Sequence, residues 1–277
     1  GTMGQGIAQV AAQSGYITWL YDLSAVALNK ARNNIQQQLS SQVQKGRLSE
    51  EEKEAVSGRL RYITIAQECK ADLIIEAIIE KIAPKVSLFQ QLAEINSAET
   101  LFASNTSSLS VTELAAQIPN PERVAGMHFF NPATHMKLVE VVSSSYTSSN
   151  TTDIISEVCR KMKKTPVLCK DAPGFIVNRV ARHFYLESLY YAEKVKPDYE
   201  VLDRLLESSG FKMGPFRLMD LIGNDINYAV TCSLYDAYDH IERFRPSPIQ
   251  KTKVDANELG RKTGKGYYDY SKNSSAL

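Results

Sequence analysis

The chain has 277 residues, of which 43% are hydrophobic and 23% are charged, as is typical of a globular protein with one or two domains. These proportions exclude intrinsic disorder, and the apolar runs are far shorter than the ~20 residues of a membrane-spanning helix. Lysine and arginine number 32 against 31 aspartates and glutamates, so the net charge of +1 leaves no basic excess for general nucleic-acid binding.

The four cysteines, Cys69, Cys159, Cys169 and Cys232, are far apart in the sequence. They form no CxxC pair and no Cys/His cluster, so we expect no metal site. Scattered thiols suit a reducing compartment and no signal-peptide pattern is visible, so we expect a cytoplasmic protein. The mitochondrial matrix stays open as an alternative, because we expect residues to be missing before Gly1.

The first part of the chain alternates helical patterns with short apolar runs. Ser24 suits the N-cap of a helix to Gln44, and Ser49 with Glu52 forms a capping-box pattern, so a helical hairpin is expected over about 24–59. Other helices are expected over 4–14, 85–96 and 111–117, and strands over 17–21, 61–65, 71–79, 101–103, 124–130 and 137–142. This alternation predicts βαβ units and a mainly parallel sheet.

The pattern changes after about Lys170. Helical patterns run over 175–194, 199–208 and 218–239, with few strand signals between them. The segment from Asp171 to Gly174 contains proline and glycine and is a natural joint. We therefore expect a Rossmann-type α/β domain over residues 1–170 and an all-α domain over residues 171–277.

A glycine-rich turn opens the chain, since Gly1-Thr2-Met3-Gly4 matches the last two glycines of GxGxxG. In that pattern the middle glycine lets the backbone approach a pyrophosphate, and the last one permits close helix packing. Asp22 ends the next strand about 20 residues on, where a carboxylate binds the adenosine ribose and repels a 2′-phosphate. NAD is therefore favoured over NADP. The alternative is a plain tight turn, with Asp22 at a solvated strand end; the strand with the first glycine is expected to precede Gly1.

His128 and Glu140 lie in two strand patterns, and the midpoint of their positions falls on Thr134 in the turn between them. Residues with this symmetry face each other across an antiparallel pair. Glu140 would then hold His128 in one tautomer and stabilise its protonated form, as in general acid–base catalysis. A core histidine satisfied by a carboxylate, or two unrelated polar residues, is the alternative.

Ser107 lies in the polar segment 104–108, which follows a strand of the expected parallel sheet. Such sheets bind ligands beyond the carboxyl ends of their strands, although an ordinary turn that caps the next helix is the alternative. Asn178 lies on the first helix after the joint, where it either contacts a ligand or faces solvent.

The motifs together resemble the L-3-hydroxyacyl-CoA dehydrogenase family, in the family's order and over nearly the whole chain. They are GTMGQGIAQVAAQSG, EAIIEK, FASNTSSL, HFFNP with MKLVEVV, CKDAPGFIVNR and GRKTGKGYYDY. The most similar subset is that of bacterial 3-hydroxybutyryl-CoA and 3-hydroxyadipyl-CoA dehydrogenases. The resemblance implies NAD-dependent oxidation of the 3-hydroxyl group of an acyl-CoA, as in β-oxidation, and a homodimer formed through the helical domain.

The resemblance also implies the role of each site residue. His128 is similar to the general base and Glu140 to its orienting partner, while Ser107 and Asn178 resemble substrate contacts. Asp22 matches the adenosine ribose contact, and Glu80 and Lys85 match the pair at the nicotinamide-side ribose. The full set of implied NAD contacts is Gly1, Met3, Gly4, Asp22, Glu80, Lys85, Ser107, Asn131 and Lys262.

The helical hairpin helps to hold CoA in this family. Lys45 matches a lysine that meets the CoA moiety, whereas Gln38 departs from the serine of some members. An exposed lysine at a helix end is the alternative for Lys45.

Two other functions are compatible with the fold. One is a dehydrogenase of a sugar acid such as gulonate, and the other is a crystallin-like structural protein that keeps dinucleotide binding. The complete set of His128, Glu140, Ser107 and Asn178 argues against the structural role, which needs no such set.

Overall fold

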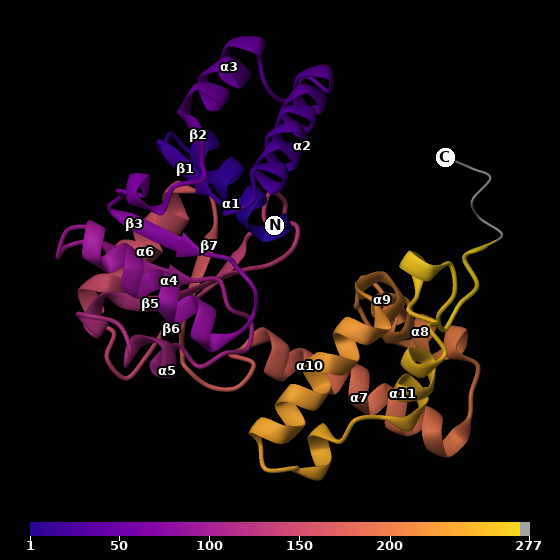
Figure 1. The fold of residues 1–277 in the computed structure, drawn as a ribbon. Coiled ribbons are helices and arrows are strands. Elements are labelled where there is room, and N and C mark those ends of the chain that lie inside the picture. The colour runs from indigo at the N-terminus through magenta and orange to yellow at the C-terminus, as the bar shows by residue number, and fades with distance from the viewer. Residues whose placement is uncertain (272–277) are drawn as a thin grey trace. The chain divides into compact units, whose positions relative to one another are not determined.

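The computed structural model describes residues 1–271, which divide into two compact units, one over residues 1–172 and one that begins at Pro173. Figure 1 shows strands only among the elements of the first unit, whereas the second is built from helices. The expected α/β domain followed by an all-α domain is confirmed.

The strands of the first unit form a five-stranded and a two-stranded sheet. The larger sheet has the order β3 (Leu73–Glu76), β4 (Leu101–Ser104), β5 (Val124–Phe129), β6 (Leu138–Ser143) and β7 (Thr165–Lys170). Its neighbours are parallel except for the antiparallel pair of β5 and β6. The smaller sheet pairs β1 (Thr18–Tyr21) with β2 (Leu60–Ile63) in parallel. The sheet is therefore mainly parallel, as the alternation of elements predicted.

Helices cover both faces of the larger sheet. Apolar side chains of α1 (Thr2–Gln13) and α6 (Ser149–Lys161) share one core cluster with β4, β5 and β6. On the other face, α4 (Ile82–Ile95) and α5 (Val111–Ala115) pack against Phe102 and Val124. All six residues of β5 are buried, which is why this strand is almost wholly apolar.

The helical hairpin forms where capping residues predicted it. The Ser24 side chain caps α2 (Ala25–Gln44), and Ser49 with Glu52 makes both bonds of a capping box at α3 (Glu50–Arg59). Ile35 and Leu39 of α2 pack with Val56 of α3 in a separate core cluster that includes residues of α1. The two helices lie side by side, as Figure 1 shows.

The second unit contains α7 (Val177–Val195), α8 (Tyr199–Ser208), α9 (Pro215–Ile222), α10 (Asn224–Ala237) and α11 (Pro248–Asp255). The single helix expected over 218–239 is wrong. Gly223 has φ = 106°, a conformation outside the right-handed helix, and it separates α9 from α10. Elements missed by the sequence patterns are α6, β7 and α11, together with the short 3₁₀ segments η1 (Ala66–Glu68), η2 (Pro121–Arg123), η3 (Glu242–Phe244) and η4 (Arg261–Thr263).

The strand expected over 71–79 is also shorter than its apolar run. It ends at Glu76, whose side chain accepts a hydrogen bond from the backbone N–H of Ile78 and so turns the chain. Ile78 and Ile79 are consequently exposed after the strand. Across residues 1–271, none of the helices combines the length and apolar character needed to cross a membrane.

The packing of β5 predicts the effect of adding one methyl group. A Cβ at Gly126 would lie 2.7 Å from the Cβ of Val142 and 3.1 Å from Cγ2 of Val111. We expect Gly126→Ala to lower the free energy of unfolding by about 1–3 kcal/mol, measured by urea denaturation. Gly58→Ala is the control, because a Cβ there meets nothing within 4 Å. This substitution also removes a glycine from α3. It should raise stability by about 0.5–1 kcal/mol; an unchanged Gly126→Ala protein would contradict the packing argument.

Candidate active site

The glycine-rich turn leads directly into α1, whose N-cap is Gly1. Asp22 follows β1, and its Oδ2 lies 3.9 Å from the backbone nitrogen of Gly1. Its Oδ1 accepts a hydrogen bond of 2.9 Å from the N–H of Ser24. The carboxylate therefore lies beside the start of α1, the place that the ribose-binding prediction requires.

The close approach of α1 occurs at a different glycine from the expected one. A Cβ at Gly4 would meet only Leu20 Cδ1, at an ordinary 3.8 Å, whereas a Cβ at Gly6 would lie 3.2 Å from that of Ala133. In the described residues the tight approach is therefore at Gly6, which faces the segment after β5, and the close-packing role of Gly4 stays a prediction. Met3 is partly buried and packs against the core cluster beneath α1.

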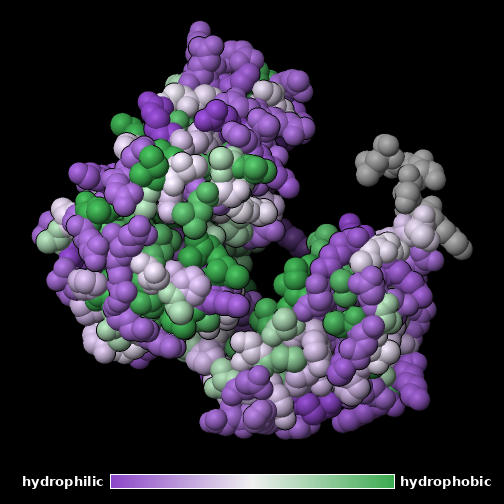
Figure 2. Space-filling view, viewed as in Figure 1, coloured by the Kyte–Doolittle hydropathy of each residue, from purple (hydrophilic) through white to green (hydrophobic). Residues whose placement is uncertain are grey.

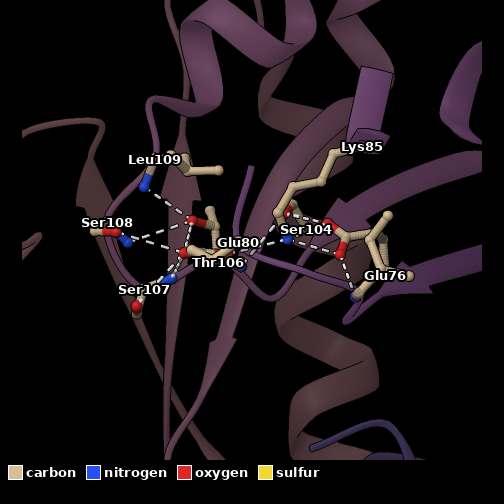
Figure 3. A network of polar contacts seen from close by, with 9 residues as sticks. Glu76, Glu80, Lys85, Ser104, Thr106, Ser107, Ser108 and Leu109 are labelled. Atoms are coloured by element: carbon tan, nitrogen blue, oxygen red, sulfur yellow. Dashed lines mark hydrogen bonds and ion pairs between the residues drawn. The ribbon is translucent and has the colours of Figure 1, made fainter. Parts of the chain in front are cut away.

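A polar network occupies the carboxyl ends of β3 and β4 (Figure 3). Glu76 and Ser104 are paired in the parallel register and end these strands. The ammonium group of Lys85 lies 2.7 Å from Oε1 of Glu76 and 3.1 Å from Oε2 of Glu80. Lys85 and Glu76 are buried, whereas Glu80 is partly exposed. The predicted pair of Glu80 and Lys85 is thus brought together, with Glu76 as a third member.

Glu80 also contacts the loop that carries Ser107. Its Oε1 accepts hydrogen bonds from the hydroxyl group of Thr106 and from the N–H of Ser107, the latter at 2.9 Å. Burial alone would raise the pKa of Glu80, but the Thr106 hydrogen bond, the charge of Lys85 and the Ser107 N–H together lower it. Glu80 therefore stays ionised at pH values at which an ordinary glutamate begins to be protonated.

His128 and Glu140 face each other directly across β5 and β6. Nδ1 of His128 lies 2.7 Å from Oε2 of Glu140, and the two residues are only 6% and 1% exposed. The symmetry about Thr134 therefore predicted the pairing correctly. The N–H of Phe129 donates to Oδ1 of Asn105 at 2.9 Å, which ties the loop after β4 to the backbone next to His128.

The remaining predicted residues lie on other elements. Asn131 is exposed in the turn after β5, and Lys45 is exposed at the C-terminal end of α2. In the second unit, Asn178 lies in the first turn of α7. Lys262 lies in η4 and forms an ion pair of 2.6 Å with Asp225.

The motif that contains Lys262 has a clear packing role. Buried Asp220 accepts hydrogen bonds from the backbone N–H groups of Tyr267 and Tyr268, each at 3.0 Å. A Cβ at Gly266 would overlap the Asp220 carboxylate. The glycine and tyrosines of GRKTGKGYYDY therefore anchor the end of the described chain to the helical unit.

Glu76 is the functional candidate that was not identified from the sequence, whereas Ser104, Asn105 and Thr106 belong to the polar segment 104–108 but received no individual role. Glu76 is the first residue of EAIIEK but was given no role there, and a charge inside a buried strand is the signal that could have found it. Among residues 1–271, no group of three or more His, Cys, Asp or Glu side chains could hold a metal ion.

The family comparisons cover both units. The family model described as "3-hydroxyacyl-CoA dehydrogenase, NAD binding domain" matches residues 1–172, and that of the C-terminal domain of the same family matches residues 174–270.

Individual relatives give the same result. The 3-hydroxyadipyl-CoA dehydrogenase of Escherichia coli is 48% identical over 98% of this chain, which spans only 57% of that protein. A crystal structure of E. coli 3-hydroxybutyryl-CoA dehydrogenase has a TM-score of 0.96 at 47% identity; it covers all of this chain, which spans 59% of its length. The (S)-3-hydroxybutyryl-CoA dehydrogenase of Ralstonia eutropha has a TM-score of 0.94 at 34% identity, with 98% of this chain and 96% of that one covered.

Glu80 should make a pH-dependent contribution to stability. Because its pKa in the folded chain lies below the ordinary 4.5, the contribution is present above that pH and is lost as the pH falls through the lowered value. We expect Glu80→Gln to lower the urea midpoint at about pH 7, and the difference from the wild type to shrink at about pH 4. Glu94→Gln on the exposed side of α4 is the control. If the urea midpoints of Glu80→Gln and the wild type differ by the same amount at both pH values, the lowered pKa of Glu80 is contradicted.

Proposed function

The chain belongs to the 3-hydroxyacyl-CoA dehydrogenase family, and we propose that it oxidises the 3-hydroxyl group of an L-3-hydroxyacyl-CoA to a ketone with NAD. The observation that carries this proposal is the buried pair of His128 and Glu140 at the carboxyl end of β5. Alcohol oxidation by hydride transfer needs a base for the hydroxyl proton, and a histidine held by a carboxylate supplies one near neutral pH.

The pair has a defined division of roles. The Glu140 carboxylate accepts a hydrogen bond from Nδ1–H of His128, which makes Nε2 the basic nitrogen. Nε2 takes the 3-hydroxyl proton, and Glu140 stabilises the imidazolium that forms. Burial strengthens this stabilisation, because little water screens the two charges.

The NAD-binding domain supplies groups that fit a dinucleotide. The N-terminus of α1 suits the pyrophosphate, Asp22 beside it suits the adenosine ribose, and Glu80 suits the other ribose. NAD held by these residues would supply the acceptor for the hydride on C3 of the substrate. Met3, Asn131 and Lys262 keep their proposed roles as cofactor contacts.

Substrate contacts complete the proposal. Ser107 and Asn178 bind the substrate oxygen and the thioester region, and Lys45 binds the CoA moiety. Support for Lys45 comes from its exposure at the end of α2, which leaves its charge accessible to a phosphate. Either a 3-hydroxybutyryl or a 3-hydroxyadipyl chain is the candidate acyl group, as the names of the relatives suggest.

Assembly and location are further parts of the proposal. The second unit exposes large apolar side chains on α7 and α8, including Val180, Val195 and Leu205, and Figure 2 shows apolar patches on its surface. Such patches favour a homodimer through this unit. All four cysteines are free thiols, which supports a cytoplasmic protein.

The test of function is NADH formation by the full chain with 3-hydroxybutyryl-CoA and 3-hydroxyadipyl-CoA, with gulonate as the comparison. Turnover of an acyl-CoA supports the proposal. Turnover of gulonate alone would favour the sugar-acid alternative, and NADH binding without any turnover would favour the structural one.

The catalytic pair predicts the effect of two amide substitutions. His128→Gln should lower kcat by about 10²–10⁴-fold without a change in fold, because the proton acceptor is removed. Glu140→Gln should also lower kcat, since a neutral amide stabilises an imidazolium less well. His135→Gln, in the exposed turn between the strands, is the control and should keep wild-type turnover. Wild-type kcat in His128→Gln would remove this residue from the mechanism.

Asp22 should set cofactor affinity and choice. We expect Asp22→Ala to weaken NADH binding by about tenfold to a hundredfold, because a charged acceptor for the ribose hydroxyls is lost. The preference of the protein for NADH over NADPH should become smaller in the same variant. Fluorescence titration of both cofactors measures this, with the exposed Asp72→Ala as the control; equal NADH affinity in Asp22→Ala and the wild type would refute the ribose contact.

A further inference from the structure

Glu76 directs all its hydrogen-bonding capacity into the protein. Its Oε1 accepts from Lys85 at 2.7 Å and from the N–H of Ile78 at 2.6 Å. Its Oε2 accepts from Lys85 at 2.8 Å and from the hydroxyl group of Ser104 at 2.7 Å. A carboxylate has about four acceptor sites, so these four hydrogen bonds from three groups saturate it. At 3% exposure, Glu76 acts on its neighbours and not on a ligand.

Lys85 likewise directs its ammonium group to partners within the protein. Its side chain is 1% exposed, and its ammonium group contacts both oxygens of Glu76 and Oε2 of Glu80. An ammonium group has three N–H donors, and three carboxylate oxygens lie within reach of them. Direct contact of Lys85 with a cofactor would require it to leave these partners. Of the two residues that the resemblance matches to the nicotinamide-side ribose, Glu80, with its side chain 37% exposed, is thus the one open to a ligand in this structure.

Glu80 in turn holds the loop after β4 in place through hydrogen bonds. Its Oε1 accepts from the N–H of Ser107 and the hydroxyl group of Thr106. The Thr106 Oγ1 in turn accepts from the N–H groups of Ser108 and Leu109, at 3.3 and 2.9 Å. As Figure 3 shows, the loop is folded around Glu80 and Thr106. One carboxylate thus lies against the backbone of the proposed substrate contact.

We propose that Glu76 and Lys85 are positioning residues that hold Glu80, so that Glu80 serves both the cofactor ribose and the loop that carries Ser107. The two ligand roles rest on the proposed function, whereas the positioning role rests on the network itself. Because Glu80 is shared, NADH that contacts it should also order Ser107. Binding of NADH and of acyl-CoA should then be coupled, each raising the affinity for the other.

The competing interpretation is a buried ion pair that only stabilises the fold. Such pairs can often be replaced by apolar side chains of similar volume with little loss of stability. The double variant Glu76→Leu with Lys85→Met makes this replacement and avoids an unpaired buried charge. It separates the two interpretations, because it removes the positioning of Glu80 while keeping the volume of the core.

The experiment uses the full chain and has two readouts. The first is amide hydrogen exchange of Ser107 and Ser108 in the ligand-free protein, and the second is the Kd for NADH with and without acetoacetyl-CoA. In the double variant we expect about tenfold faster exchange at Ser107, about tenfold weaker NADH binding and loss of the coupling to acetoacetyl-CoA. Lys251→Met with Asp255→Leu replaces an exposed pair on α11 and should leave all three unchanged.

A folded double variant with wild-type exchange at Ser107 and wild-type NADH affinity would overturn the proposal. Should that variant not fold, Glu76→Gln supplies the test, since the amide keeps the shape and weakens the hold on Lys85; unchanged readouts there overturn the proposal too. Exchange in the ligand-free protein does not depend on the reaction. Faster exchange at Ser107 without any turnover of acyl-CoA by the wild type would therefore support the positioning role and refute the proposed function.

Discussion

The register of three parallel strands and the reversal of a fourth bring the candidate site together. Glu76, Ser104 and Gly126 lie side by side across β3, β4 and β5, so the residues that follow them emerge at one edge of the sheet. His128 lies two residues beyond Gly126 on β5, and the antiparallel β6 places Glu140 opposite it. A parallel β6 would need a long crossover and could not deliver Glu140 by a short turn. The one antiparallel pair of this sheet is therefore the constraint on which the proposed catalytic pair depends.

Burial imposes a second condition on this site, because an ionised side chain in the interior must have its partner at hand. Lys85 has Glu76 and Glu80, and the Glu140 carboxylate has Nδ1–H of His128, each on an adjacent or nearby element. The charge of Lys85 is therefore compensated within the protein. What remains directed outward is the ionised Glu80, whose lowered pKa follows from Thr106, Lys85 and Ser107 despite its burial.

Local signals predicted those parts of the fold that depend on a few neighbouring residues. The capping box at Ser49, the N-cap at Ser24 and the symmetry of His128 and Glu140 each involve a short stretch of chain, and each was found in the structure. The break at Gly223 was missed because a helical apolar pattern continues across it, and only the backbone conformation reveals the interruption.

The polar network was harder to predict because it does not depend on neighbouring residues of the chain. Ser104 and Glu76 meet through strand pairing, and Asn105 meets Phe129 across the sheet edge, so their partners are distant in sequence. No periodicity encodes such contacts. The roles of Ser107, Asn178, Lys45 and Lys262 remain predictions, since they concern ligands and not contacts within the chain.

The near-neutral charge of the chain limits how it could hold the two phosphorylated ligands of the proposed function. With a net charge of +1, a general positive field does not attract them, so each phosphate must be met by a local group. Lys85 is unsuited to this task because its charge is already compensated by Glu76 and Glu80. In the proposed function the pyrophosphate is assigned to the backbone N–H groups at the start of α1, whose first turn contains no acidic residue. In α3, by contrast, three glutamates occupy the first turn and already interact with the positive end of that helix. The distribution of acidic residues, more than their number, thus separates a helix end suited to an anion from one that is not.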